Sequence, residues 1–206
     1  MDNMVPINEC IAINLKGIEE SKSIVALHET GHLIVMYAFD LMEYFNGITI
    51  ISGNGTLGLT DMVPNFANEM DEYANSIDRL EGNLQQSGEE LDAFISAQYL
   101  QGLKLYLPHI CRLFAGGSIT RYYEISAEEL CQIDRENIIR ILRQYQLDNQ
   151  IEIIQNLIDL LLKNVFLFYD TLIKTIYMNL LKHKTLSVDD INCIISEWKR
   201  SRPFPD

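Results

Sequence analysis

This chain is short of basic residues and rich in acidic ones. Its 206 residues include 16 Lys and Arg against 29 Asp and Glu, which gives a formal net charge of −13 at pH 7. A strongly acidic protein repels the phosphates of nucleic acids and the headgroups of anionic membranes. Neither nucleic acid nor a membrane is therefore an expected partner.

The sequence also lacks a long uncharged apolar run. Its two most apolar stretches, residues 24–42 and 157–181, are each interrupted by several ionisable side chains. A membrane-spanning helix needs about 18 apolar residues with few or no charges, so we expect none. The opening Met-Asp-Asn-Met-Val-Pro lacks the basic start and apolar run that are typical of a secretory signal peptide.

Cysteine is scarce and scattered. The four cysteines form neither a C-x-x-C pair nor a closely spaced framework: Cys10, Cys111, Cys131 and Cys193. Dense cysteine frameworks are typical of small secreted proteins, whereas widely spaced thiols usually stay reduced inside the cell. The pattern predicts a cytoplasmic protein whose cysteines are packed within the fold.

The rest of the composition is that of an ordinary globular protein, with 48% hydrophobic and 22% charged residues. The length suits one domain, and the hydrophobic periodicity predicts a mainly α fold with one small β-hairpin. We expect a single domain over residues 1–206. Within it, residues 21–146 form a first part that contains the hairpin at 47–60, and residues 151–200 form a C-terminal helical bundle.

Local signals place the first elements. A helix is expected over residues 21–40, with Ser21 or Ser23 as its N-cap. The following runs at 47–52 and 56–60 flank a Gly-Asn-Gly sequence, which is a strong turn signal and predicts the hairpin.

The middle of the chain is less regular. Residues 65–92 hold eight acidic side chains and one basic one, which predicts a mobile, solvated segment. Ser-x-x-Glu capping boxes at 87–90 and 126–129 predict helices running to about residues 115 and 146, with Gly116-Gly117 ending the first. Further helices are predicted at about 151–164, 165–182 and 188–199, the last capped by Ser187.

His28-Glu29-Thr30-Gly31-His32 is an H-E-x-x-H motif. Residues four apart on a helix lie one turn above each other, so both imidazoles can reach a single ion. Catalytic zinc sites combine three protein ligands with a water, which the neighbouring Glu29 can hold. The motif predicts His28 and His32 as Zn²⁺ ligands and Glu29 as the catalytic base. The alternative is a pair of core histidines satisfied by hydrogen bonds.

Asp134 is the candidate third ligand. It falls on the apolar stripe of the helix predicted over residues 127–145. A carboxylate on a buried face costs several kcal/mol unless it meets a cation or a metal. Because Lys and Arg are scarce here, a metal is an attractive partner. The alternative is an aspartate at the rim of the stripe that pairs with an arginine or a backbone N–H.

Several segments resemble, in the same order, the peptidase domain of the FtsH family of membrane-anchored, ATP-dependent zinc proteases. Residues 26–35, Ala-Leu-His-Glu-Thr-Gly-His-Leu-Ile-Val, are similar to the family's H-E-A-G-H helix, which implies a zincin-like helix. The hairpin over 48–60 resembles V-T-I-I…A-L-G-V-T. The Leu-Phe-Ala-Gly run at 113–116 resembles the L-A-G-R turn, and residues 180–191 resemble the closing L-L…T-L…E-I.

The resemblance implies a zinc metallopeptidase that cleaves flexible or unfolded polypeptides with a metal-activated water. Ile133-Asp134 falls where the family's N-D pair supplies its third zinc ligand, an aspartate. In that family the outer strand of the hairpin pairs with an extended substrate. The corresponding substrate-binding candidates here are Thr56, Leu57, Gly58, Leu59 and Thr60. The alternative is a hairpin that only covers the core.

The chain departs from the family in ways that affect substrate delivery. No G-x-x-x-x-G-K-[ST] loop is present, so the activity is expected to be independent of ATP on its own. Folded substrates would then need an unfoldase or adaptor in trans, and homo-oligomerisation stays open. The alternative function is a weakly active or inactive zinc-binding interaction module derived from the same fold. Retention of Glu29 argues against it, because a structural zinc site has no use for a general base.

Overall fold

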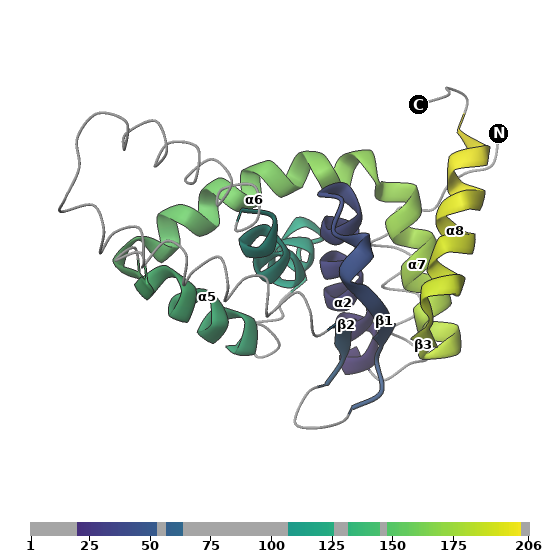
Figure 1. Ribbon diagram of the computed structural model, residues 1–206, viewed down its shortest axis with the longest axis horizontal. Helices are drawn as coiled ribbons and strands as arrows, with labels where there is room; N and C mark the ends of the chain where they lie inside the picture. Colours follow the sequence, from purple (N-terminus) through teal and green to yellow (C-terminus); the bar gives the residue numbers. More distant parts are fainter. Residues whose placement is uncertain (1–19, 53–56, 64–106, 126–131, 145–147, 203–206) are drawn as a thin grey trace, which may run out of the picture.

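The computed structural model describes residues 20–52, 57–63, 107–125, 132–144 and 148–202 (Figure 1). Helices dominate these ranges, which confirms the mainly α prediction. They are α2 (Glu20–Ala38), α5 (Gln132–Gln144), α6 (Ile151–Phe168), α7 (Asp170–His183) and α8 (Val188–Ser201). Residues 107–122 form a further helix, here called the 107–122 helix. Two 3-10 turns, η1 (Met42–Tyr44) and η3 (Asp148–Gln150), complete the helical elements.

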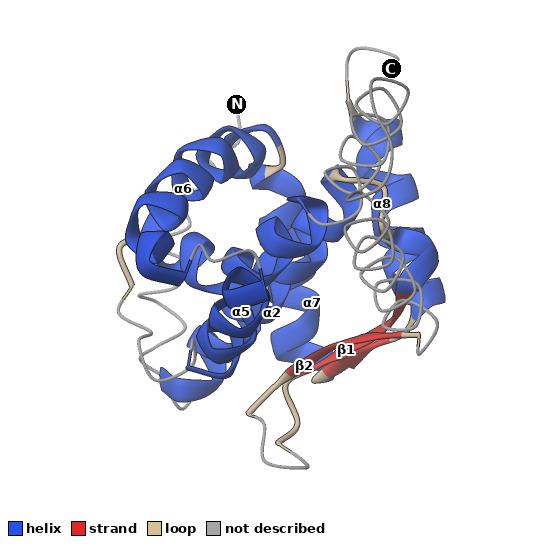
Figure 2. Cartoon of the chain, turned by 60° about the vertical axis from the view of Figure 1, so that its left-hand side comes forward, coloured by secondary structure: helices blue, strands red, loops and turns tan. Residues whose placement is uncertain are grey.

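The β structure is a small antiparallel sheet of three strands rather than a two-stranded hairpin. Its strands are β1 (Phe45–Thr49), β2 (Leu59–Met62) and β3 (Thr185–Leu186), in the order β2-β1-β3. Ile48 pairs with Thr60 on one side and with Leu186 on the other. Figure 2 shows the sheet along one edge of the molecule, next to α2 and α7.

The observed strands begin and end elsewhere than predicted. β1 ends at Thr49. Ile50 beyond it is still buried and donates its backbone N–H to the Lys184 carbonyl, whereas Ile51 is 57% exposed. A bulge lies between Phe45 and Gly47, where Gly47 has a φ of 147°. This conformation favours glycine and re-aims the strand before it pairs with β3.

The core is built around α2, which is buried on nearly every side. Its fully buried side chains include Leu27, Leu33, Ile34 and Met36. α7 packs against α2 with Leu172, Ile173, Ile176 and Tyr177. A helix that buries side chains on nearly every face is expected inside a protein, and α2 has that central place.

The predicted N-cap of this first helix is wrong. α2 begins at Glu20, so Ser21 and Ser23 lie inside the helix. Ser23 is 1% exposed, and its hydroxyl hydrogen-bonds the Tyr177 hydroxyl of α7. The serine that the local pattern predicted as the N-cap therefore forms a contact between two helices instead.

The prediction that Gly116-Gly117 ends a helix is also wrong. The 107–122 helix runs through both glycines. A Cβ atom at Gly31 of α2 would lie 2.6 Å from Ile119 Cγ2 and 2.8 Å from the Ala115 carbonyl oxygen. The two helices thus approach so closely that no side chain fits between them at these positions. The glycines allow this packing and do not end the helix.

The C-terminal helices match the predicted order but not every boundary. The break between α6 and α7 falls at Tyr169, not at residue 164, because Ile158, Leu162 and Phe166 continue one buried stripe along α6. α7 and α8 lie side by side, and α6 extends away from them (Figure 1).

The predicted start of α8 is confirmed. The Ser187 side chain accepts from the Asp190 backbone N–H at 3.2 Å, and Asp190 accepts from the Ser187 backbone N–H at 2.8 Å. This reciprocal capping box satisfies two backbone donors that no helical carbonyl can reach.

Several predictions fall outside the described residues. They are the Gly-Asn-Gly turn, Thr56, the acidic segment 65–92, and the capping boxes at 87–90 and 126–129. Within the described ranges, no helix combines the length and apolarity needed to cross a membrane.

Candidate metal centre

Three side chains from two helices converge on one point. His28 and His32 of α2 are 5% and 4% exposed, and their Nε2 atoms lie 3.0 Å apart. Asp134, in the first turn of α5, brings Oδ2 to 3.1 Å from His28 Nε2 and 3.2 Å from His32 Nε2. The candidate ligands that the sequence indicated therefore meet, with their three donor atoms at the corners of a nearly equilateral triangle.

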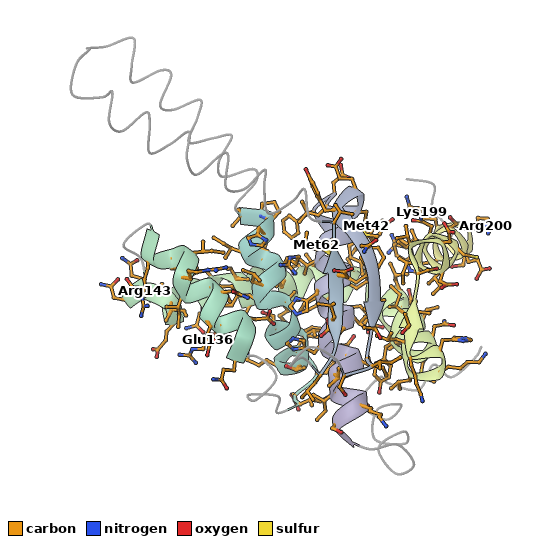
Figure 3. The ribbon with its side chains drawn as sticks, turned by 60° about the horizontal axis from the view of Figure 1, so that its bottom comes forward. Met42, Met62, Glu136, Arg143, Lys199 and Arg200 are labelled. Carbon is orange, nitrogen blue, oxygen red and sulfur yellow. The ribbon has the colours of Figure 1, made fainter. Side chains whose placement is uncertain are left out.

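The orientation of α5 explains why Asp134 points inward. Ile138, Ile141 and Leu142 are buried on the same side of that helix. Glu136 and Arg143 lie on its exposed side, and Figure 3 shows both pointing away from the rest of the molecule. The helical period thus places the carboxylate with the apolar stripe, as expected from the sequence.

This triangle fits a tetrahedral zinc ion. Bonds of about 2.0–2.2 Å in that geometry separate neighbouring ligand atoms by about 3.3–3.6 Å, only slightly more than observed. Two imidazoles and a carboxylate are also a ligand set that zinc accepts. A single cation satisfies all three donor atoms at once, whereas hydrogen bonds among them require one nitrogen to share a proton with two neighbours.

The second nitrogen of His32 fixes which tautomer is present. His32 Nδ1 lies 2.7 Å from the backbone carbonyl oxygen of Arg112. A carbonyl only accepts, so Nδ1 carries the proton and donates it. In the neutral ring, Nε2 then presents its lone pair toward His28 and Asp134, which is the arrangement that a metal ligand needs.

Charge inside the cluster keeps the carboxylate ionised. Burial favours the neutral acid, but His32 and His28 outweigh it and hold the pKa of Asp134 below its ordinary value. Burial lowers the pKa of His32, yet the Asp134 carboxylate beside it outweighs burial and the pKa ends above its ordinary value. When no metal is bound, the carboxylate and a proton on His32 stabilise each other, and a bound metal ion would take the place of that proton.

Glu29 is buried beside the ligands and is held by the sheet. It is 6% exposed, and its Oε2 accepts a hydrogen bond of 2.8 Å from the Thr60 hydroxyl of β2. A Cβ atom at Gly58 would lie 2.9 Å from both Cγ and Oε1 of Glu29. Thr60 and Gly58 were predicted to bind substrate. Both contact Glu29, the candidate base, and no local sequence pattern predicted these contacts.

Two further candidates for the substrate-binding strand, Leu57 and Leu59, are exposed. Leu57 and Leu59 are 55% and 45% exposed, and only Leu59 and Thr60 of the proposed set lie in β2. β2 is an edge strand of the sheet, with β1 on its other side. Among the described residues no strand pairs with its other edge, so the backbone groups there are open to an added strand.

Gly116 lies against the candidate site, although the sequence did not mark it as a site residue. A Cβ atom there would lie 2.3–2.5 Å from three atoms of the His28 ring. The 107–122 helix thus forms a wall of the site, and only glycine allows the imidazole its present place. A Gly-Gly pair in an apolar segment was the available signal, and it was taken for a helix end.

Comparison with known proteins adds no assignment. No protein-family model matches the chain, and no curated protein matches it either. What the site does must therefore be argued from its own residues.

Proposed function

We propose that this protein is a zinc-dependent metallopeptidase that hydrolyses peptide bonds of flexible or unfolded polypeptides. The carrying observation is the triangle of His28, His32 and Asp134 with a buried carboxylate, Glu29, beside it on the same helix. A purely structural zinc site closes its fourth position with another ligand and needs no base. Three converging ligands and an adjacent base match the catalytic kind.

A zinc ion held by His28, His32 and Asp134 would supply a Lewis acid for the scissile carbonyl and would lower the pKa of a water. Glu29 takes the proton from that water as its oxygen attacks the carbonyl carbon. Because Thr60 donates to Oε2, Oε1 is the atom that we assign to the proton. Glu29 then passes the proton to the amine nitrogen as the C–N bond breaks.

The substrate is proposed to be an extended polypeptide. The edge of β2 that no described strand pairs with offers backbone hydrogen bonds to a strand laid alongside it, and Thr60 of the same strand contacts Glu29. Only a flexible or unfolded segment can adopt that conformation without first breaking its own structure. In this proposal, hydrolysis by the chain needs no ATP, and an unfoldase or adaptor in the cytoplasm presents folded substrates.

The test combines zinc analysis with cleavage of an unstructured peptide. Wild type is expected to bind one zinc and cleave the peptide. Glu29→Gln should keep the zinc and lose about 10² to 10⁴-fold in kcat, the usual contribution of a general acid–base group. His28→Ala should lose both, because it removes a ligand.

Glu136→Gln is the matched control, since Glu136 is exposed on the outer side of α5. It should behave as wild type in both measurements. If Glu29→Gln cleaves as fast as wild type, the assigned base is wrong. A wild-type protein that holds zinc and cleaves nothing supports the inactive zinc-binding module instead.

A further inference from the structure

Arg112 lies on the side of the 107–122 helix that faces the metal centre. It stands one turn before Gly116, which seats the His28 ring, and its carbonyl accepts from His32 Nδ1. The two helices run in opposite directions, because Gly116 meets His28 while Arg112 meets His32. The backbone of Arg112 is therefore held by a hydrogen bond to His32, a candidate metal ligand.

No described residue forms a hydrogen bond or an ion pair with the Arg112 side chain. Its Nε is buried without a hydrogen-bond partner, and the side chain forms no ion pair with the described residues. A buried donor that has lost its hydrogen bonds to water and makes none to the protein costs free energy. A bound ligand that accepts a hydrogen bond from it would remove this cost.

The charge of Arg112 interacts with the two carboxylates of the site, Asp134 and Glu29. Burial lowers the pKa of Arg112, while Asp134 and Glu29 raise it. The guanidinium also helps, after burial, to lower the pKa of the neighbouring His109 to about 3, so that this imidazole stays neutral. An arginine remains protonated even under such burial. The Arg112 guanidinium therefore interacts electrostatically with Glu29 and Asp134 and forms an ion pair with neither.

We propose that the Arg112 guanidinium is the anion subsite of this centre and binds the oxyanion that develops on the scissile carbonyl oxygen. This inference rests on the proposed peptidase function. When the water oxygen bonds to the carbonyl carbon, the carbonyl π pair moves onto its oxygen and the water proton moves to Glu29. Negative charge thereby leaves Glu29 and appears on the substrate. A guanidinium near both places stabilises the new charge with N–H donors that were unused before.

The test measures binding of a peptide phosphonamidate, which carries a tetrahedral anionic group in place of the scissile amide. Arg112→Met is expected to weaken its binding to the zinc-loaded protein by about 10² to 10³-fold, the range found for removal of one oxyanion donor. Binding of the uncleaved peptide, measured in a Glu29→Gln background, should change less than about threefold. kcat should fall with the phosphonamidate affinity while KM stays unchanged.

Three controls separate this role from a structural one. Arg112→Lys retains a cation without the planar fork and should recover part of the phosphonamidate affinity. Arg143→Met removes an exposed guanidinium from α5 and should change nothing. Zinc affinity should be kept in Arg112→Met, because the contact to His32 is made by the backbone.

Several outcomes would overturn the inference. One is equal phosphonamidate binding by wild type and Arg112→Met, and another is no binding by zinc-loaded wild type. A third is an equal loss for phosphonamidate and uncleaved peptide, which indicates ground-state binding. A loss confined to peptides with a free C-terminal carboxylate indicates that this carboxylate is the ligand. If zinc-loaded wild type binds the phosphonamidate through Arg112 but cleaves no peptide, the proposed function fails and the anion subsite stands.

Discussion

At the scale of single residues, the side chains that local spacing brings together were predictable, and those that tertiary structure brings together were not. His28 and His32 face one point because a helix repeats every 3.6 residues. Asp134 could be found because a carboxylate on an apolar stripe demands a partner. Thr60 meets Glu29 across 31 positions of the sequence, and neither residue's neighbours mark that contact.

Thr60 provides the first test at this scale. Thr60→Val keeps the shape of the side chain and removes the hydroxyl that donates to Glu29 Oε2 at 2.8 Å. Hydrogen bonds to charged groups contribute about 1.5–3 kcal/mol, so we expect kcat to fall at least about tenfold, with KM little changed. Steady-state cleavage of an unstructured peptide measures both constants.

Two other variants complete this test. Thr60→Ser keeps the hydroxyl and should retain most of the activity. Thr49→Val removes a hydroxyl from β1 that bonds Lys184 and Thr185 instead of Glu29, and it should leave kcat unchanged. Full activity in Thr60→Val would show that the hydrogen bond does not position the base.

At the scale of elements, the type of each described helix was predictable, and its ends were less so. Hydrophobic periodicity located the helices, and Ser187 marked the start of α8 correctly. The boundary at Tyr169 and the unbroken 107–122 helix depend on which faces are buried by distant segments. Gly116 illustrates the difficulty, since the residue that most often ends a helix is here the one that lets two helices touch.

This close contact gives a prediction with two different readouts. Gly116→Ala should reduce zinc affinity by more than about tenfold, because the added methyl displaces the His28 ring. Gly31→Ala should mainly destabilise the fold, by about 1–3 kcal/mol, because its methyl meets Ile119 and the Ala115 carbonyl instead of a ligand. Competition with a chelating dye measures the first effect, and urea denaturation of the zinc-free protein measures the second.

The contrast between the two variants is the control. A zinc affinity that is unchanged in Gly116→Ala would contradict the close approach of the 107–122 helix to His28. A greater loss of zinc affinity in Gly31→Ala than in Gly116→Ala would show that helix packing, rather than the seat of the imidazole, controls the site.

At the scale of the whole molecule, the sequence predicted the class of fold but not how its distant parts join. β3 contains two residues and pairs with β1 136 positions earlier. A strand this short carries no periodic signal, so its place in the sheet follows only from the packing of α7 and α8. The pairing joins the C-terminal helices to the sheet that holds Glu29, through Ile48 and Leu186.

The candidate metal ligands join the molecule in a second way. His28 and Asp134 are 106 positions apart, on α2 and α5, and each approaches the other only in the folded chain. An ion held by both binds the native state and not the unfolded one, so it should stabilise the whole fold. Zinc at about a thousand times its dissociation constant contributes about 4 kcal/mol, which for a chain of this size corresponds to about 8–16 °C in Tm.

Calorimetry with excess zinc and with EDTA measures this shift. Asp134→Ala removes one ligand and should abolish most of the response to zinc, while Glu136→Ala, on the exposed side of the same helix, should retain it. The comparison isolates the site from any general effect of zinc on an acidic surface, because both variants remove one negative charge from α5. Equal responses in the two variants would place the stabilising ion elsewhere, and α2 and α5 would then be held together by the hydrogen bonds of His28 and His32 with Asp134.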